Sequence, residues 1–438
     1  MDQHHHQRRA GTAQGRHEAI GNRPRGRTHG RRGVHRGQGG AHCDRQAAPV
    51  GAGRCAGTFA ATRDGAVTSS TWLDASIARA VAGTSRLAAA ARDFPHIVDH
   101  GTWQFTPDGV WTGGFWAGCL WLAAQHGGPA TLRVQAIAAT ERLLPHVHAA
   151  RNHDLGFMFY PSAVAAWRAT DDGRYLEAAK TAARSLAAQF DAHAGYIPGW
   201  GFFGGEDWRG SVLVDTLMNL PLLVLAARHG GDAGLLKVVR AQVATTLGHH
   251  LRADGSVYHV YRFDPATGAA LGGATYQGLA ADSAWSRGQA WAITGLAILA
   301  GMLGDGTYRA ASARVADYFV AHLPADGVPP WDFKAPAGAP KDASAGAIAA
   351  YGMLRLHELT HEQRWLGAAL RLVRALHDSC ENQGDDPGLL LHATADLPHG
   401  LGVDGTTMYG DYYWFKTLVR LRQVLTTRHL DASLDVPA

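Results

Sequence analysis

The sequence predicts an all-α fold, an (α/α)6 barrel in which six helical hairpins close into a toroid. Amphipathic helical patterns recur along the chain, apolar helical patterns alternate with them, and strand patterns are scarce. Three amphipathic segments align on one aromatic residue, with small residues three and four positions later and a bulky one eleven positions later; these aromatic residues are Tyr175, Tyr308 and Trp365. Self-similarity at a period of about 50 residues is typical of a solenoid or a closed toroid.

The elements alternate in chain order. Amphipathic helices, which we expect on the outside, are predicted near 72–92, 130–147, 173–190, 233–249, 306–321 and 363–378. Helices that are apolar nearly all round, which we expect to be buried, follow them near 115–126, 161–169, 212–229, 284–302, 343–359 and 409–425. Because neither terminal hairpin has the polar face of a cap, closure is favoured over an open superhelix. The best strand pattern is 256–263, which lies between two turn signals.

The first 55 residues differ in composition from the rest. They contain eleven Arg, no Lys and three acidic residues, so they carry a formal charge of +8, against +4 for the whole chain. Because they are rich in Arg, Gly and His and poor in aliphatic residues, we expect them to be disordered. The predicted organisation is a disordered extension at 1–67, a barrel domain at 68–428 and a short tail at 429–438. The basic charge belongs to the extension and says little about the partners of the folded part. An Arg/Gly-rich extension could bind nucleic acid, but a solvated extension is favoured, so we expect no nucleic-acid partner.

Several classes of protein are not supported by the sequence. No apolar run approaches the roughly 20 residues of a membrane span, and no signal-peptide pattern opens the chain. We therefore expect no membrane partner and a cytoplasmic protein, either a monomer or a weak homo-oligomer. The four cysteines lack the paired spacing of a disulfide framework or a zinc site, and we expect neither a metal nor an organic cofactor; they are Cys43, Cys55, Cys119 and Cys380.

Two carboxylates lie in unusually apolar surroundings. Asp215 is the only ionisable side chain in 211–226, and Asp154 precedes an apolar, aromatic run in 153–163. Desolvation alone can raise the pKa of an acid by up to roughly 3 to 5 units, so such a group can hold a proton near neutral pH. The structural alternative is that Asp215 caps the helix that follows it. Two such carboxylates in one chain favour acid/base chemistry.

Gly, aromatic and polar residues concentrate in the segments that lead into the apolar helices, namely 111–116, 153–160, 214–219, 276–291, 329–345 and 397–414. In a barrel these segments meet at one end, where the mixture suits sugar rings and their hydroxyls, although any single Trp could instead be core. His153 and His259 lack the spacing of a metal pair and are interpreted as hydrogen-bonding groups. Arg287 needs an anionic partner, either a substrate carboxylate, which we favour, or Asp282 or Asp332.

Seven motifs in order resemble the unsaturated glucuronyl hydrolases, glycoside hydrolase family 88. They are WTGGFW, HDLGFMFY, VDTLMNLPLL, YQGLAADSAWSRGQAW, PPWDFKAP with KDASAGAIAA, GLLLHAT and YGDYYW. Their joint occurrence over roughly residues 70 to 425 makes the resemblance specific. It implies an (α/α)6 barrel that acts on oligosaccharides left by polysaccharide lyases, for example from glycosaminoglycans, whose non-reducing end is a 4,5-unsaturated uronic acid.

The resemblance also implies a mechanism and a set of site residues. The C4=C5 bond is an enol ether, which is protonated at C4 and hydrated at C5, so the glycosidic bond is not attacked directly as in most glycosidases. Asp215 matches the general acid/base of the family, and Asp154 matches its second essential acid. The substrate-binding positions that match are His153, His259, Gln277 and Arg287, with Trp111, Trp200 and Trp291 as stacking walls.

Some features depart from the family pattern and leave alternatives open. Tyr276 stands where the family often has His or Thr, and the segment 393–404 has no Ser/Lys cluster for a sulfate group, so preference for sulfated substrates stays open. The nearest rival is an unsaturated rhamnogalacturonyl hydrolase that acts on pectin fragments. Others are a sugar epimerase or polysaccharide lyase on the same toroid, and a non-catalytic carbohydrate-binding protein.

Overall fold

The computed structural model describes residues 63–199, 208–230 and 232–434, which belong to one compact unit. Trp200, most of the predicted extension 1–67 and the end of the predicted tail 429–438 lie outside the described residues. Within the described ranges, no helix is long and apolar enough to cross a membrane. Cys119 and Cys380 are both buried and free.

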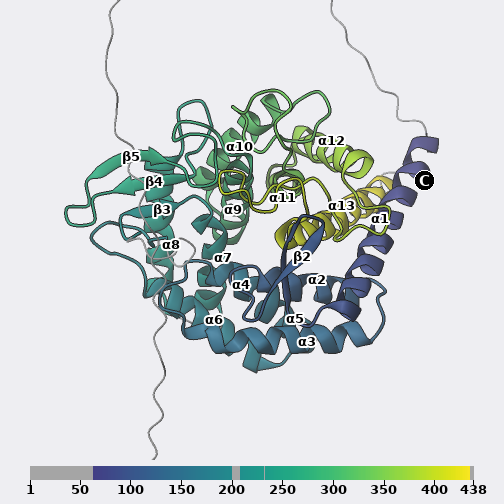
Figure 1. Ribbon diagram of the computed structural model, residues 1–438, viewed down its shortest axis with the longest axis horizontal. Coiled ribbons are helices and arrows are strands. Elements are labelled where there is room, and N and C mark those ends of the chain that lie inside the picture. The colour runs from purple at the N-terminus through teal and green to yellow at the C-terminus, as the bar shows by residue number, and fades with distance from the viewer. Residues whose placement is uncertain (1–62, 200–207, 231, 435–438) are drawn as a thin grey trace, which may run out of the picture. The chain divides into compact units, whose positions relative to one another are not determined.

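The predicted alternation of outer and inner helices is confirmed (Figure 1). The outer helices are α1 (Arg63–Ala90), α3 (Thr131–Leu143), α6 (Gly173–Ala187), α8 (Gly234–Thr245), α10 (Gly306–Ala321) and α12 (Gln363–Ser379). The inner helices are α2 (Gly113–Gln125), α4 (Leu155–Phe159) with α5 (Ala165–Thr170), α7 (Thr216–Arg228), α9 (Ser286–Leu303), α11 (Ala343–Thr360) and α13 (Met408–Leu434). The aligned aromatic residues Tyr175, Tyr308 and Trp365 are buried on outer helices, as their stripe predicts.

The inner helices form a closed ring. Consecutive members contact one another from α2 through α4, α7, α9 and α11 to α13, and α13 packs in turn against α2, which excludes the open superhelix. Glycines allow this close approach: a Cβ on Gly156 would lie 2.3 Å from Cα of Asn219, and one on Gly295 would lie 2.8 Å from Cβ of Leu217. Protein interiors are packed too tightly to absorb such overlaps, so these contacts between α4, α7 and α9 require glycine.

The second inner helix begins earlier than its predicted start at 161. It runs from Leu155 through α4, a π-helical turn η2 (Tyr160–Val164) and α5. Proline has no N–H to donate and crowds the preceding turn, so a regular α-helix is not expected to continue through Pro161. The wider π turn instead carries the chain past Pro161, with Ser162 Oγ donating to the carbonyl of Met158. The 3₁₀ turn η1 (Leu144–His148) and the π turn η3 (Thr246–His250) extend two outer helices.

The strands are short, and most were not predicted. β1 (Phe94–Asp99) pairs with β2 (Thr102–Thr106), and β3 (Ser211–Leu213), β4 (Val260–Phe263) and β5 (Ala270–Ala274) form a second antiparallel sheet in the order β3-β4-β5. The predicted strand 256–263 is confirmed in its second half, as β4. One further bond, from the amide of Val214 to the carbonyl of His259 (2.9 Å), fixes the backbone directly before Asp215. The second sheet therefore positions the start of α7.

Candidate active site

The predicted site residues meet in a pocket at the end of the barrel where outer helices give way to inner ones. It encloses about 370 Å³, including open solvent at its mouth, and is lined by Trp111, His153, Asp154, Leu213, Asp215, Gln277, Trp285, Arg287 and Trp291. Seven of the nine predicted site residues are in that lining. Of the other two, His259 lies behind the wall and Trp200 is outside the described residues. Leu213 and Trp285 were not predicted, although Trp285 lies within the DSAWSRGQAW motif.

Asp215 occupies the position before α7, but its side chain makes no capping hydrogen bond. The capping interpretation is therefore wrong. Its Oδ1 is buried and has no hydrogen-bond partner among the described residues. Burial, and next the nearby charge of Asp154, raise the pKa of Asp215 to about 7, while His153, the backbone amide of Asp215 itself and Arg287 act in the opposite direction. Because burial is the largest influence and Oδ1 is unpaired, this carboxyl favours the protonated form.

Asp154 is more deeply buried and better hydrogen-bonded. It is 6% exposed; its Oδ1 accepts from Nδ2 of Asn219 at 3.2 Å and lies 3.5 Å from Nε2 of His153. Burial raises its pKa to about 7, and the bond from Asn219 opposes that rise. The charge of Asp154 raises the pKa of Asp215, so the ionisation of Asp215 depends on that of Asp154. Because Asp154 accepts a hydrogen bond from Asn219, whereas Oδ1 of Asp215 has no donor among the described residues, the arrangement favours negative charge on Asp154 and the proton on Asp215.

Asn219 links the two acids structurally, because it donates a hydrogen bond to Asp154 and lies on the helix that begins after Asp215. It was not predicted as a site residue. It lies one turn after Asp215 on the same face of α7, is completely buried, and accepts a 2.7 Å bond from the amide of Phe157 on α4. Its two hydrogen bonds therefore tie α4 and Asp154 to the helix that carries Asp215. The available signal was a polar side chain four residues after the acid in an otherwise apolar helix.

Replacing Asn219→Ala is expected to move the acidic limb of the kcat/KM profile to higher pH. The substitution removes a donor that lowers the pKa of Asp154, so Asp154 takes up its proton at a higher pH than before. Gln242→Ala is the matched control, because Gln242 is also a fully buried amide that accepts from a backbone amide, that of Ile197, but it does not line the pocket. If both variants lose activity equally at every pH, Asn219 has only a structural role.

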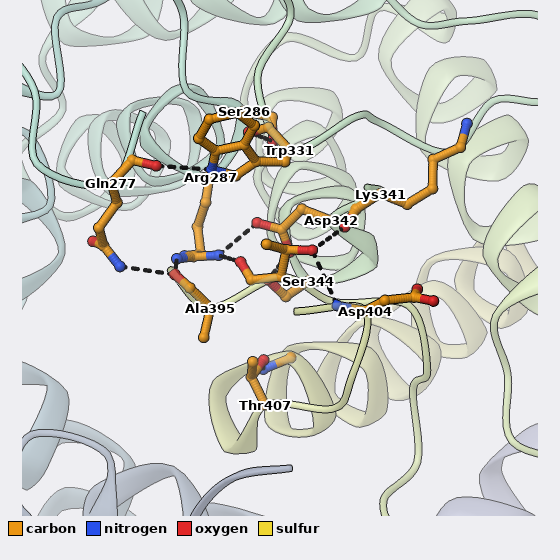
Figure 2. A network of polar contacts seen from close by, with 12 residues as sticks. Gln277, Ser286, Arg287, Trp331, Lys341, Asp342, Ser344, Ala395, Asp404 and Thr407 are labelled. Carbon is orange, nitrogen blue, oxygen red and sulfur yellow. Dashed lines mark hydrogen bonds and ion pairs between the residues drawn. The ribbon is translucent and has the colours of Figure 1, made fainter. Parts of the chain in front are cut away.

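Arg287 is a buried ion-pair partner as well as a pocket residue. It is 1% exposed, and its Nη1 donates to Oδ2 of Asp342 at 2.5 Å and to the carbonyl of Thr394 at 2.7 Å (Figure 2). Nη2 donates to the carbonyl of Ala395. The rings of Trp285 and Tyr409 lie 4.5 and 5.0 Å from the guanidinium.

The prediction that Asp282 or Asp332 is the structural partner of Arg287 was wrong. The Asp282 side chain is 83% exposed and lies 4.0 Å from Nζ of Lys334, and Asp332 accepts from Oγ of Ser283 and from nearby backbone amides. The true partner, Asp342, lies at the start of α11, in the next hairpin. The guanidinium charge is thus already compensated within the protein, and Arg287 still presents an edge to the pocket.

Gln277 holds the chain segment beside Arg287. The side-chain Nε2 of Gln277 donates to the backbone carbonyl of Ala395 at 2.8 Å, and the backbone carbonyl of Gln277 accepts from Nε1 of Trp331 at 2.7 Å (Figure 2). The segment 393–404 thus lies against the pocket wall. It contains no Lys or Arg.

His259 supports the pocket from behind. It is 3% exposed, and its Nδ1 lies 3.3 and 3.4 Å from the backbone amides of Tyr276 and Gln277. Accepting from these amides places the ring proton on Nε2. Burial lowers the pKa of His259 to about 3, so the ring is neutral. With its ring 4.3 Å from that of Trp285, His259 orients two residues of the lining.

Aromatic side chains form a packed cluster in and behind the pocket wall. Trp111 stacks on Tyr409 with ring centroids 5.1 Å apart, and Trp291 meets the same tyrosine edge-on at 6.3 Å. Phe157 packs against both tryptophans. Trp291 is 1% exposed, whereas Trp111 is only half-buried, so Trp111 has more surface available for a sugar ring.

A carboxyl pair with raised pKa values, set among aromatic side chains at one end of an (α/α)6 barrel, is typical of a glycoside hydrolase. No protein-family model matches the sequence. The chain is 35% identical over 346 residues to an unsaturated glucuronyl hydrolase of Bacillus sp. (strain GL1), covering 76% of this chain and 92% of that protein. It is also 35% identical over 326 residues to an unsaturated chondroitin disaccharide hydrolase of Streptococcus pyogenes serotype M1, covering 71% and 80%. The chain belongs to the unsaturated glucuronyl hydrolase family.

Solved structures agree with this assignment. The crystal structure of the Bacillus sp. GL1 unsaturated glucuronyl hydrolase, responsible for the degradation of glycosaminoglycan, matches with a TM-score of 0.76 at 33% identity, covering 81% of this chain and 98% of that one. A variant of the Streptococcus agalactiae enzyme complexed with dGlcA-GalNAc6S matches with a TM-score of 0.67 at 26% identity, covering 82% and 92%. The predicted fold and enzyme class are confirmed.

Proposed function

We propose that this enzyme hydrates the C4=C5 bond of an unsaturated uronic acid at the non-reducing end of an oligosaccharide. The observation that carries the proposal is the unpaired, buried Oδ1 of Asp215 beside the hydrogen-bonded Asp154. Protonation of carbon needs an acid that still holds its proton near neutral pH, and the raised pKa of Asp215 meets that need.

In the proposed mechanism, Asp215 donates its proton to C4, and positive charge develops at C5 and on the ring oxygen. The anionic Asp154 stabilises this charge electrostatically. The Asp215 carboxylate then removes a proton from water as the water oxygen bonds to C5, which restores the acid. The resulting hemiketal opens as the C5–ring-oxygen bond breaks and the C5 hydroxyl proton passes to the ring oxygen. This leaves a hemiacetal at C1, whose hydroxyl proton passes to the departing sugar oxygen as the C1–O bond to that sugar breaks, and the former unsaturated sugar is released as an open-chain keto-uronic acid.

The remaining lining residues are proposed to bind and orient the substrate. Arg287 and Gln277 face the uronate, and since the charge of Arg287 is already balanced by Asp342, we expect Arg287 to contribute orientation more than affinity. His153, beside Asp154, is proposed to bind ring hydroxyls. Trp111 and Trp291 are proposed to hold the ring faces.

The proposed substrates are unsaturated disaccharides derived from glycosaminoglycans. Relatives that match most of this chain are named as glucuronyl or chondroitin disaccharide hydrolases, which favours this class over pectin fragments. Supplying unsaturated chondroitin and rhamnogalacturonan disaccharides separately, and following loss of the enol-ether absorbance, tests the proposal. Turnover of only the rhamnogalacturonan fragment would overturn the substrate class, and formation of new unsaturated product from intact polymer would indicate a lyase.

The pH profile of kcat/KM is expected to have its basic limb near pH 7. A raised pKa means that Asp215 remains protonated up to about 7 and loses its proton above that, so activity should fall about tenfold per pH unit on the alkaline side. An aspartate with an ordinary pKa of about 3.9 would be ionised throughout this range. Initial rates at several pH values, with thermal stability recorded at each, provide the check. A flat profile up to about pH 9 would exclude Asp215 as the acid.

A further inference from the structure

A second pocket lies between α1, the segment that follows α12, and α13. It encloses about 420 Å³, including open solvent, and shares no residue with the catalytic pocket. Its polar lining residues include Arg79, Arg86, Glu381 and Trp414. Glu381 follows an outer helix and Trp414 lies in the second turn of an inner one, so this pocket is at the same end of the barrel as Asp215.

Glu381 is a buried carboxylate that is satisfied on one oxygen only. Its side chain is 2% exposed, and Oε2 accepts from Nη2 of Arg79 at 2.6 Å and from Oγ of Ser76 at 3.0 Å, with Nδ1 of His377 also at 2.6 Å. Oε1 is buried as well, yet it has no hydrogen-bond partner in the described part of the chain. A buried acceptor of this kind calls for a donor.

Two donors in the same lining are also buried and unpaired. Nε of Arg79 and Nε1 of Trp414 have no acceptor among the described residues, although Arg79 already binds Glu381 through Nη2. Arg79 and Glu381 are thus joined through Nη2 and Oε2, while Nε of Arg79 and Oε1 of Glu381 stay unpaired among the described residues. Among the described residues, the lining side chains thus hold one unpaired acceptor and two unpaired donors, all three buried.

This mixture selects hydroxyl groups. A hydroxyl can both accept from an N–H such as Nε of Arg79 and donate to a carboxylate oxygen such as Oε1 of Glu381, whereas an anion would meet the Glu381 carboxylate and a cation would meet Arg79 and Arg86. The pocket opens to solvent, so a ligand larger than one water can enter it. We propose that this pocket binds one ring of a neutral saccharide, which Arg79, Glu381 and Trp414 hold through its hydroxyls.

Blocking the pocket from an exposed position tests the proposal. Ala82 is exposed on α1 and lines the pocket, so Ala82→Trp fills the pocket without removing a polar contact; Ala75→Trp, exposed two turns earlier and outside the lining, is the matched control. The probe is methyl β-D-glucopyranoside, followed by calorimetric titration of the full chain. We expect Ala75→Trp to bind it like the wild type and Ala82→Trp to bind at least about tenfold more weakly. Turnover of the unsaturated chondroitin disaccharide should be equal in all three.

Two further variants test the assigned contacts. Glu381→Gln replaces the acceptor by an amide of the same size, and Trp414→Phe removes the indole N–H; each should weaken the glucoside while thermal stability shows that the fold is kept. Equal affinity in Ala82→Trp and Ala75→Trp would overturn the proposal, as would absence of any glucoside binding. Binding of inorganic phosphate that Ala82→Trp abolishes, without binding of the glucoside, would also overturn it and indicate an anion site.

Discussion

Asp215→Asn is expected to lower kcat by about 10² to 10⁴-fold while leaving the affinity for the unsaturated disaccharide close to that of the wild type. Asparagine keeps the shape of the side chain but cannot donate a carboxylic proton to C4. The size of the loss is set by the usual contribution of a positioned general acid. Steady-state kinetics, with calorimetric titration of the inactive variant, separate the two quantities.

Asp411→Asn is the matched control for this experiment. Asp411 is 1% exposed, and burial raises its pKa to about 8, yet it lies outside the catalytic pocket. Its Oδ1 accepts from the amides of Leu389 and Leu390, and the Oδ1 of asparagine can keep both bonds. The control should therefore retain turnover. Equal turnover in wild type and Asp215→Asn would exclude the proposed mechanism.

Asp215→Asn is also expected to stabilise the fold at alkaline pH. The pKa of Asp215 is raised in the folded protein, so its contribution to stability is complete below the unfolded-state pKa of about 3.9 and is lost as pH rises through about 7. Asparagine never ionises, so above pH 7 the variant should have a higher free energy of unfolding than the wild type, and at low pH the difference should shrink. Urea unfolding at several pH values measures this.

Asp342→Ala is expected to lower the free energy of unfolding by about 3–5 kcal/mol. Asp342 has no exposed surface and is the acid that balances the buried guanidinium of Arg287. Removing it leaves a positive charge in the interior with only carbonyl groups and aromatic faces around it, and the bond from Oγ of Ser344 is lost as well. Urea unfolding at neutral pH provides the measurement.

Asp326→Ala provides the comparison at an exposed ion pair. Asp326 accepts from Nζ of Lys341 at 2.6 Å, but its side chain is 54% exposed, so its loss should cost no more than about 1 kcal/mol. Combining Asp342→Leu with Arg287→Met should recover much of the stability, because an apolar pair can replace a buried ion pair. If Arg287 also orients substrate, this double variant will fold well and still have impaired kcat/KM. Equal losses for Asp342→Ala and Asp326→Ala would contradict the buried-charge argument.

Helix positions could be predicted because their signals are local. A single window of sequence shows the apolar stripe that follows Tyr175 or Trp365, and it also shows the apolar surface of 284–302. Both patterns reflect burial in the final barrel. Strands β3 and β5 escaped prediction because they span only three and five residues and depend on pairing with β4. Pairing between distant segments has no local signature.

The chemical identity of the site was available in the sequence by itself. Asp154, Asp215 and Arg287 are charged residues at the starts of buried helices, where apolar packing does not require a charge. The order of the motifs that contain them linked them to one family. Only the tertiary structure decided how these charges are used. It gave Arg287 its partner in Asp342, and it gave Asp154 a donor in Asn219 while leaving Oδ1 of Asp215 with none. Desolvation and hydrogen bonding set which acid keeps its proton, and both depend on groups that folding brings together from different hairpins.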